Sequence, residues 1–172
     1  AYTLDSTFVK SMSVDASTLD VGEDLTFGGA SSVTRMDITS GAGADAITLG
    51  TVGDTVDAGL GNDTVVGTSG GNNISLGGGN DSLTAGTGNE VVDGGAGNET
   101  LNLAGNLNAG DSINGGDGVD TLLISTGIAT ASVLGGSSNL EILTVTGVNT
   151  ITANGNLGGA NIFNLSDDAN QT

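Results

Sequence analysis

The sequence is built on a repeat of nine residues, in which an acidic or amide residue is followed two positions later by an aliphatic one. The polar residues are separated by nine positions, apart from one interval of twelve: Asp45, Asp54, Asp63, Asn72, Asp81, Glu90, Glu99, Asp111 and Asp120. Their aliphatic partners are Ile47, Val56, Val65, Ile74, Leu83, Val92, Leu101, Ile113 and Leu122. Glycines fill most positions two and four residues before each polar residue. This pattern is typical of a turn and a short strand that recur along a solenoid.

The composition excludes several fold classes. The chain of 172 residues has 32 glycines, no proline and no cysteine. Such glycine content is common in fibrous or disordered chains. However, the glycines do not recur every third residue as in collagen, and a flexible linker would not return an aliphatic residue in register. With three Phe, one Tyr and no Trp, the core must be a narrow stack of Val, Ile and Leu, which is all that a solenoid needs.

The charge excludes several kinds of partner. The net charge is −18, and Lys10 and Arg35 are the only basic residues. Nucleic-acid binding is not expected, because it depends on neutralising phosphates. Membrane insertion is not expected either, since no apolar run is long enough to span a bilayer. The chain has no histidine and no cysteine, and its regularly spaced acids suit metal binding, so we do not expect an enzyme.

The most complete repeats resemble the glycine-rich nonapeptides of the RTX (repeats-in-toxin) family, whose pattern is G-G-x-G-x-D-x-U-x. One unit is Ser40-Gly41-Ala42-Gly43-Ala44-Asp45-Ala46-Ile47-Thr48, and others are 58–66, 76–84, 94–102 and 115–123. The resemblance covers residues 40–123. It implies an all-β fold, a right-handed parallel β-roll or β-solenoid. Each nonapeptide would form half a coil, and several Ca²⁺ ions would lie in the glycine-rich turns between successive coils.

Alternate units would then place their turns on opposite edges of the roll. We name these the glycine-rich edge, whose turns end at Asp45, Asp63, Asp81, Glu99 and Asp120, and the glycine-poor edge, whose turns end at Asp54, Asn72, Glu90 and Asp111. Every turn on the glycine-rich edge keeps both glycines. On the glycine-poor edge only the turn from Gly86 to Glu90 keeps them, because Val52, Thr68, Leu107 and Ala109 stand at other glycine positions.

The residues expected to hold calcium are the paired glycines and the acid of each complete turn. Calcium prefers roughly six to eight oxygen ligands, and glycine lets backbone carbonyls point inward by accepting φ > 0. We therefore predict a calcium-loaded glycine-rich edge, with up to four positions between its five turns, and a mostly structural glycine-poor edge. The predicted residues are Gly41, Gly43, Asp45, Gly59, Gly61, Asp63, Gly77, Gly79, Asp81, Gly86, Gly88, Glu90, Gly95, Gly97, Glu99, Gly116, Gly118 and Asp120.

Calcium is expected to be a condition for folding. Neighbouring strands lie about 4.8 Å apart, so the acids of one edge would stack like charges at close range. Metal binding would reverse that repulsion and would be coupled to folding. A metal-free solenoid, in which Asp and Asn only form turns by bonding their own backbone, is the alternative, and we expect it for the glycine-poor edge. Glu90 and Glu99 depart from the family's Asp, and Asn72 lacks a charge.

The flanks are predicted to be β-structure without calcium turns. Residues 1–39 would continue the solenoid upstream, since Ile38 precedes Ile47 by nine residues although Met36 holds the acid position. Residues 124–172 would continue it downstream. Acids outside the repeats, such as Glu141, are expected to face water.

The Thr, Ala and Gly-rich flanks resemble bacterial S-layer proteins that contain RTX repeats, in segments such as Val14-Asp15-Ala16-Ser17 and Asn139–Val145. The resemblance implies a secreted, calcium-dependent structural component of a cell-surface lattice that associates with itself. An RTX module of a secreted adhesin or toxin is the alternative.

Overall fold

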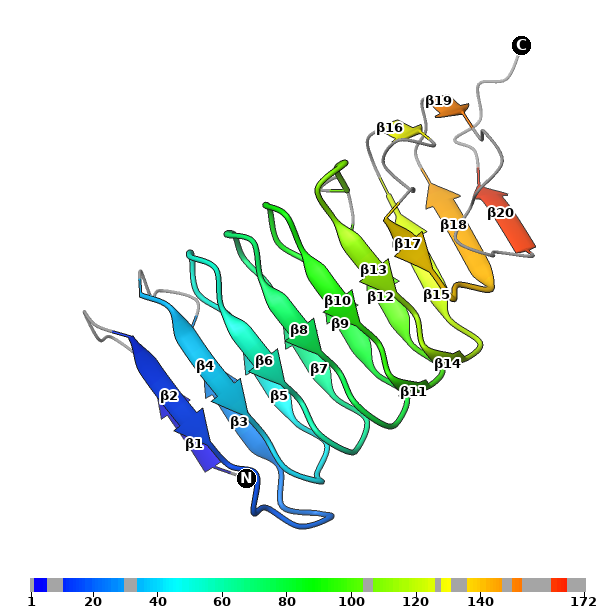
Figure 1. The fold of residues 1–172 in the computed structure, drawn as a ribbon. Coiled ribbons are helices and arrows are strands. Elements are labelled where there is room, and N and C mark those ends of the chain that lie inside the picture. The colour runs from blue at the N-terminus through cyan, green and yellow to red at the C-terminus, as the bar shows by residue number, and fades with distance from the viewer. Residues whose placement is uncertain are drawn as a thin grey trace.

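The chain folds into two parallel β-sheets that face one another along a solenoid (Figure 1). The structure is a computed structural model, and it describes residues 2–5, 11–29, 34–103, 107–125, 128–130, 136–146, 150–152 and 162–166. Within these ranges all regular structure is β-strand. No helix among them could cross a membrane.

Successive strands alternate between the two sheets. The larger sheet has nine strands in the order β1 (Tyr2–Asp5), β3 (Leu25–Gly28), β5 (Ala46–Thr48), β7 (Thr64–Val66), β9 (Ser82–Thr84), β12 (Thr100–Asn102), β15 (Thr121–Ile124), β18 (Ile142–Thr146) and β20 (Ile162–Ser166). The smaller sheet has seven strands, which are β2 (Met12–Asp15), β4 (Met36–Thr39), β6 (Thr55–Asp57), β8 (Asn73–Ser75), β10 (Val91–Asp93), β13 (Ser112–Asn114) and β17 (Ser137–Ser138). This arrangement confirms the predicted all-β parallel solenoid.

Two short strand pairs lie outside the main sheets. They join β11 (Ala96–Gly97) to β14 (Asp117–Gly118), and β16 (Ile128–Thr130) to β19 (Thr150–Thr152). The pair β11 and β14 belongs to the turns of the glycine-rich edge, and shows that these turns also bond to one another from coil to coil.

The register confirms that two nonapeptides make one coil. Ile47 in β5 lies opposite Val65 in β7, which in turn lies opposite Leu83 in β9. Sheet neighbours are therefore eighteen residues apart. The interval grows to twenty-one between Thr100 and Thr121, because the extra residues between Glu99 and Asp111 enter that coil.

The interior is a narrow stack of aliphatic side chains. The aliphatic residue of every repeat, from Ile47 to Leu122, is at most 2% exposed. In the three-residue strands of the repeats, from β5 to β13, the middle residue points inward and its neighbours point outward, as in β7 and β9. Burying one such side chain contributes about 1.5–3 kcal/mol. Short strands are sufficient here because each coil covers the hydrophobic face of the next.

The same two sheets extend beyond the repeats in both directions. Upstream, Ile38 in β4 lies opposite Val56, as its nine-residue spacing predicts. Met36 is fully buried at the acid position of that coil. Downstream, β18 pairs with β15 and places Leu143 opposite Leu122.

Candidate functional site

The glycine-rich edge has a distinctive backbone. In four of its turns both glycines adopt positive φ: +87° and +123° at Gly59 and Gly61, +96° and +133° at Gly77 and Gly79, +98° and +143° at Gly95 and Gly97, and +107° and +146° at Gly116 and Gly118. Left-handed backbone of this kind is readily adopted only by glycine. The sequence pattern therefore reports a repeated turn conformation.

The first turn of this edge differs although it has the same glycines. Gly41 and Gly43 do not adopt positive φ. They stack on the loop that leads into β3, since a Cβ on Gly41 would lie 2.4 Å from the Leu19 carbonyl oxygen and one on Gly43 would lie 2.6 Å from that of Glu23. The first turn thus lacks a glycine-rich turn on its upstream side.

The four similar turns stack too closely for any side chain at their second glycine. A Cβ on Gly79 would lie 1.8 Å from the Gly61 carbonyl oxygen, and one on Gly97 would lie 1.7 Å from that of Gly79. A Cβ on Gly118 would lie 1.5 Å from the Gly97 carbonyl oxygen. The edge therefore presents a row of closely spaced backbone carbonyl groups.

The acids of the glycine-rich edge form a hydrogen-bonded column. In four of the five acids, all except Glu99, one carboxylate oxygen accepts the backbone N–H at the acid position of the preceding coil. The Asp45 N–H donates to Asp63 Oδ1 at 2.8 Å, and the Asp63 N–H donates to Asp81 Oδ1 at 2.8 Å. Further along, the Glu99 N–H donates to Asp120 Oδ1 at 2.8 Å. These bonds hold the carboxylates in line, one coil apart.

The remaining carboxylate oxygens of this column have no partner. They are Oδ2 of Asp45, Asp63, Asp81 and Asp120, and both Oε atoms of Glu99. All five residues are at most 3% exposed. Burying a carboxylate oxygen without a hydrogen bond or counter-ion is strongly unfavourable. Each of these atoms therefore needs a proton or a cation.

Three acids of the column, Asp63, Asp81 and Glu99, have raised pKa values. Burial, with smaller contributions from the carboxylates of Asp81 and Asp45, raises the pKa of Asp63 to about 7. Burial and then the adjoining Asp120 carboxyl raise the pKa of Glu99 to about 8. Burial also raises the pKa of Asp81. The column resists carrying uncompensated negative charge.

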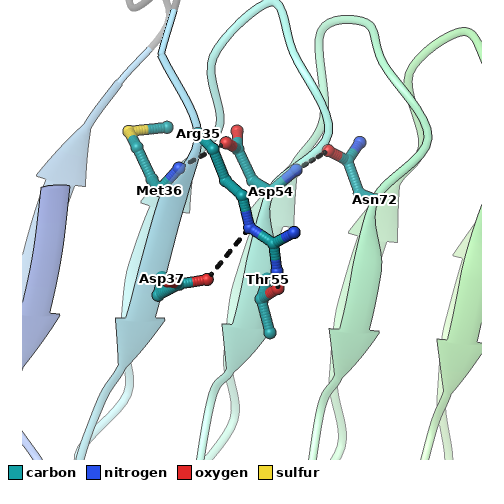
Figure 2. A network of polar contacts seen from close by, with 6 residues as sticks. All are labelled: Arg35, Met36, Asp37, Asp54, Thr55 and Asn72. Atoms are coloured by element: carbon teal, nitrogen blue, oxygen red, sulfur yellow. Dashed lines mark hydrogen bonds and ion pairs between the residues drawn. The ribbon is translucent and has the colours of Figure 1, made fainter. Parts of the chain in front are cut away.

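The glycine-poor edge has the same ladder, as Figure 2 shows at Asp54. Most of its acids have partners for both carboxylate oxygens. Asp54 accepts the Met36 N–H at 2.8 Å with Oδ1 and the Gly50 N–H at 2.9 Å with Oδ2. The Asp54 N–H donates to Asn72 Oδ1 at 3.0 Å. Asp111 similarly accepts the N–H groups of Glu90 and Asn108, each at 2.8 Å. These residues are turn formers.

Glu90 is intermediate between the two edges. Its Oε2 accepts the Asn72 N–H at 2.9 Å, whereas its buried Oε1 has no partner. Within its turn Gly88 has a φ of +138° but Gly86 does not adopt positive φ. The sequence places Glu90 among the metal ligands, and the structure gives it one free oxygen without the stack of similar turns.

The one basic side chain in the described part of the chain lies away from the glycine-rich column. Arg35 is exposed and bridges two coils of the smaller sheet, with Nε 3.4 Å from Asp37 Oδ1 and Nη2 donating to Thr55 Oγ1 at 2.8 Å (Figure 2). Lys10 lies outside the described residues. No arginine or lysine described by the structure therefore compensates the column.

The oxygen atoms at the glycine-rich edge suit a cation that is coordinated by backbone carbonyl groups as well as by carboxylates. In the described ranges, no group of three or more Asp, Glu, His or Cys side chains converges on a metal position. An ion between two coils would have to combine carboxylate oxygens with turn carbonyls. Calcium commonly takes such mixed sets of oxygen ligands.

Sequence reasoning missed one member of the column. Glu141 occupies the acid position of the coil after Asp120, since Thr121 lies opposite Ile142. Two signals could have found it. Glu141 follows Asp120 by the same twenty-one residues that separate Asp120 from Glu99, and Leu143 stands at the aliphatic position two residues later.

No protein-family model, curated protein or solved structure matches this chain.

Proposed function

We propose that the glycine-rich edge binds several calcium ions between its stacked turns. The observation that supports this most directly is the row of buried carboxylate oxygens without partners, at Asp45, Asp63, Asp81, Glu99 and Asp120. The glycine turns that precede them supply carbonyl oxygens at the same edge, which is the mixture that calcium prefers. The paired glycines and acids of the RTX-like turns are the ligands in this proposal.

Calcium explains the column better than protons alone. Protonation could neutralise single groups, because the pKa of Asp63 is about 7 and that of Glu99 about 8. However, one proton neutralises only one carboxylate, whereas the column stacks five buried acids whose oxygens have no partner. A divalent cation satisfies two facing oxygens at once. Binding would release protons and stabilise the folded state.

The proposed role of calcium is structural. With a net charge of −18, the metal-free chain repels itself and favours expanded conformations. Extracellular calcium modules bind at roughly 10⁻⁴ to 10⁻³ M. A chain with this threshold would fold after leaving the cell. We therefore propose a secreted protein in which calcium couples export to folding, and we propose no catalytic, nucleic-acid-binding or membrane-spanning role.

The parent protein is proposed to be a subunit of a bacterial S-layer lattice. The long solenoid, with flanks that extend the same sheets, suits a rigid element of such a lattice. The resemblance of the flanking sequence to RTX-containing S-layer proteins supports this reading over the alternative, an RTX module of a secreted adhesin or toxin.

A calcium titration tests both parts of the proposal. Circular dichroism would follow β-structure and light scattering would follow assembly on one sample, from chelator to about 10 mM calcium. We expect β-structure to appear with calcium and scattering to rise with it. A solenoid that is complete in chelator would contradict calcium-coupled folding. Folding without assembly would favour the adhesin or toxin module.

A further inference from the structure

The acidic column continues beyond the last glycine-rich turn. Glu141 Oε2 accepts the Asp120 N–H at 2.8 Å, which is the bond that Asp63, Asp81 and Asp120 make with the coil before them. Glu141 is half-buried and has no glycine pair in front of it. The register and the hydrogen bond therefore assign Glu141 to the column, although its turn has no repeat motif.

Asp120 lies beneath this end of the column with an unsatisfied oxygen. The residue is 0% exposed. Its Oδ1 accepts the Glu99 N–H, but its Oδ2 is buried without a partner. The coil toward the N-terminus bonds to Oδ1, and the coil toward the C-terminus can supply a further ligand to Oδ2.

A backbone carbonyl from that coil reaches the same place. Around the missing Cβ of Gly115, the Asn139 carbonyl oxygen would lie 1.9 Å away and Asp120 Oδ2 2.7 Å away. One coil earlier the arrangement is the same at Gly94, where the Gly115 carbonyl oxygen would lie 2.0 Å and Glu99 Oε2 3.2 Å from the missing Cβ. A carboxylate oxygen and a carbonyl oxygen thus converge at both glycines.

The corner that delivers this carbonyl is unlike the others. Asn114 lies opposite Ser138 and Thr121 lies opposite Ile142, so a corner of six residues, 115–120, is followed by one of three, 139–141. Asn139 turns this corner with a φ of +49°, and its side chain donates to Asn114 Oδ1 at 2.8 Å. Asn tolerates left-handed backbone better than most residues. The short corner brings its carbonyl and the Glu141 carboxylate to Asp120.

We propose that Asp120, the Asn139 carbonyl and Glu141 form an additional calcium site at the C-terminal end of the column, built without a glycine-rich turn. This inference rests on the proposed calcium binding of the edge as a whole. The additional site extends the column by one coil. It pairs the last glycine-rich turn with the corner at 139–141, which has no glycine pair.

The test counts bound ions on the folded chain. Native mass spectrometry in calcium would compare the wild type with Glu141→Gln, which keeps an acceptor for the Asp120 N–H but removes the charge. The matched control is Asp57→Asn, which removes an exposed charge from β6. We expect Glu141→Gln to bind one calcium ion fewer than the wild type and Asp57→Asn to bind the same number.

The outcomes separate this inference from the proposed function. An unchanged ion count in Glu141→Gln overturns the additional site and leaves the other sites in place. A wild type that binds no calcium overturns the proposed function, and the additional site with it. If Glu141→Gln does not fold, Glu141→Asp serves instead, since it keeps the charge but withdraws the carboxylate by one methylene. One ion should then bind about tenfold more weakly, and unchanged affinity for every ion overturns the site.

Discussion

The two edges of the solenoid carry the same ladder of acids but treat the second carboxylate oxygen differently. On the glycine-poor edge Asp54 Oδ2 accepts the Gly50 N–H. On the glycine-rich edge Asp63 Oδ2 is equally buried and accepts nothing. The ladder bond through Oδ1 is common to both edges and so reports only the stacking of coils. The second carboxylate oxygen differs between the edges. Where it accepts a hydrogen bond within its own turn, the turn needs no ligand, and where it accepts none, the turn needs one.

The cause lies in the backbone N–H groups of the turns. On the glycine-rich edge these donors are used between coils, since the Leu60 N–H donates to the Gly41 carbonyl and the Gly61 N–H to the Gly78 carbonyl. The Gly59 N–H, which precedes Asp63 by four residues as Gly50 precedes Asp54, does not donate to Asp63 Oδ2. On the glycine-poor edge the Gly50 N–H folds back onto its own acid. The glycine-rich turns thus bond to the turns of neighbouring coils, and their acids keep an oxygen without a partner.

The largest expected effect is removal of calcium. We expect chelation to abolish the β-structure of the glycine-rich edge, because its carboxylates would then be charged and uncompensated. Hydrogen exchange would measure the effect at each strand. Protection should fall first around β7, β9 and β12. If protection falls equally and at the same time at every strand, the two edges do not differ in their dependence on calcium.

The next effect is that of a single methyl group at a stacked glycine. Gly79→Ala places a Cβ 1.8 Å from the Gly61 carbonyl oxygen at a φ of +133°. We expect a loss of about 2–4 kcal/mol in calcium, from strain and separation of the coils. Denaturant unfolding would measure it. The control is Gly28→Ala in β3, where a Cβ meets nothing within 4 Å, and a change beyond about 0.5 kcal/mol there would question the packing.

A matched pair of substitutions contrasts the edges directly. In chelator, Asp81→Asn should favour the folded state, because it removes a buried charge whose Oδ2 has no partner. Asp54→Asn should disfavour it by about 1–3 kcal/mol, since either amide orientation leaves an N–H donor facing a donor. In calcium, Asp81→Asn should raise the calcium midpoint and Asp54→Asn should not change the ion count.

The measurement for this pair is a calcium titration of each variant followed by circular dichroism and ion counting. If both substitutions shift the stability of the folded state in the same direction in chelator, the proposed difference between the edges is wrong. Loss of a calcium ion in Asp54→Asn would show that the glycine-poor edge also binds metal.

The smallest expected effect is a pH dependence of the metal-free chain. The pKa of Asp63 is raised from 3.8 to about 7 and that of Glu99 from 4.5 to about 8. The folded state therefore binds more protons than the unfolded state, and the stability of the fold should increase as the pH falls from about 8 toward about 4. Circular dichroism in chelator at pH 8 and pH 5 would test this.

The double variant Asp63→Asn, Glu99→Gln provides the control for that prediction. It should retain less of the pH dependence than the wild type, because two of the shifted groups are gone. A metal-free chain that becomes less folded on acidification would contradict the sign.

Much of the architecture could be predicted from the sequence because the repeat encodes it locally. The position of Ile47 or Leu83 two residues after an acid identifies the buried face, and the spacing of the acids gives the coil. The backbone of Gly59 and Gly61 also follows from their place in the motif. These features depend only on neighbours that repeat the same pattern.

The rest depended on what each turn stacks against. Gly41 and Gly43 match the motif yet take another backbone, because their upstream neighbour is the loop around Leu19 and Glu23. Glu141 was expected to face water, yet it lies in the column because a corner of three residues replaces one of six. The hydrogen bond from Gly50 to Asp54 is likewise a property of the folded turn.

The acid ladder has one direction along the solenoid. Every bond runs from the backbone N–H of one coil to the carboxylate of the coil that follows it in sequence, as from Asp45 to Asp63 and from Asp120 to Glu141. Cutting the stack therefore produces unequal ends. Removing a coil from the C-terminal side strips the acceptor from an inward-facing N–H, whereas removing one from the N-terminal side frees only a carboxylate oxygen that water can reach. If the coils fold in order of synthesis, the ladder N–H of each coil finds its acceptor only when the next coil has folded.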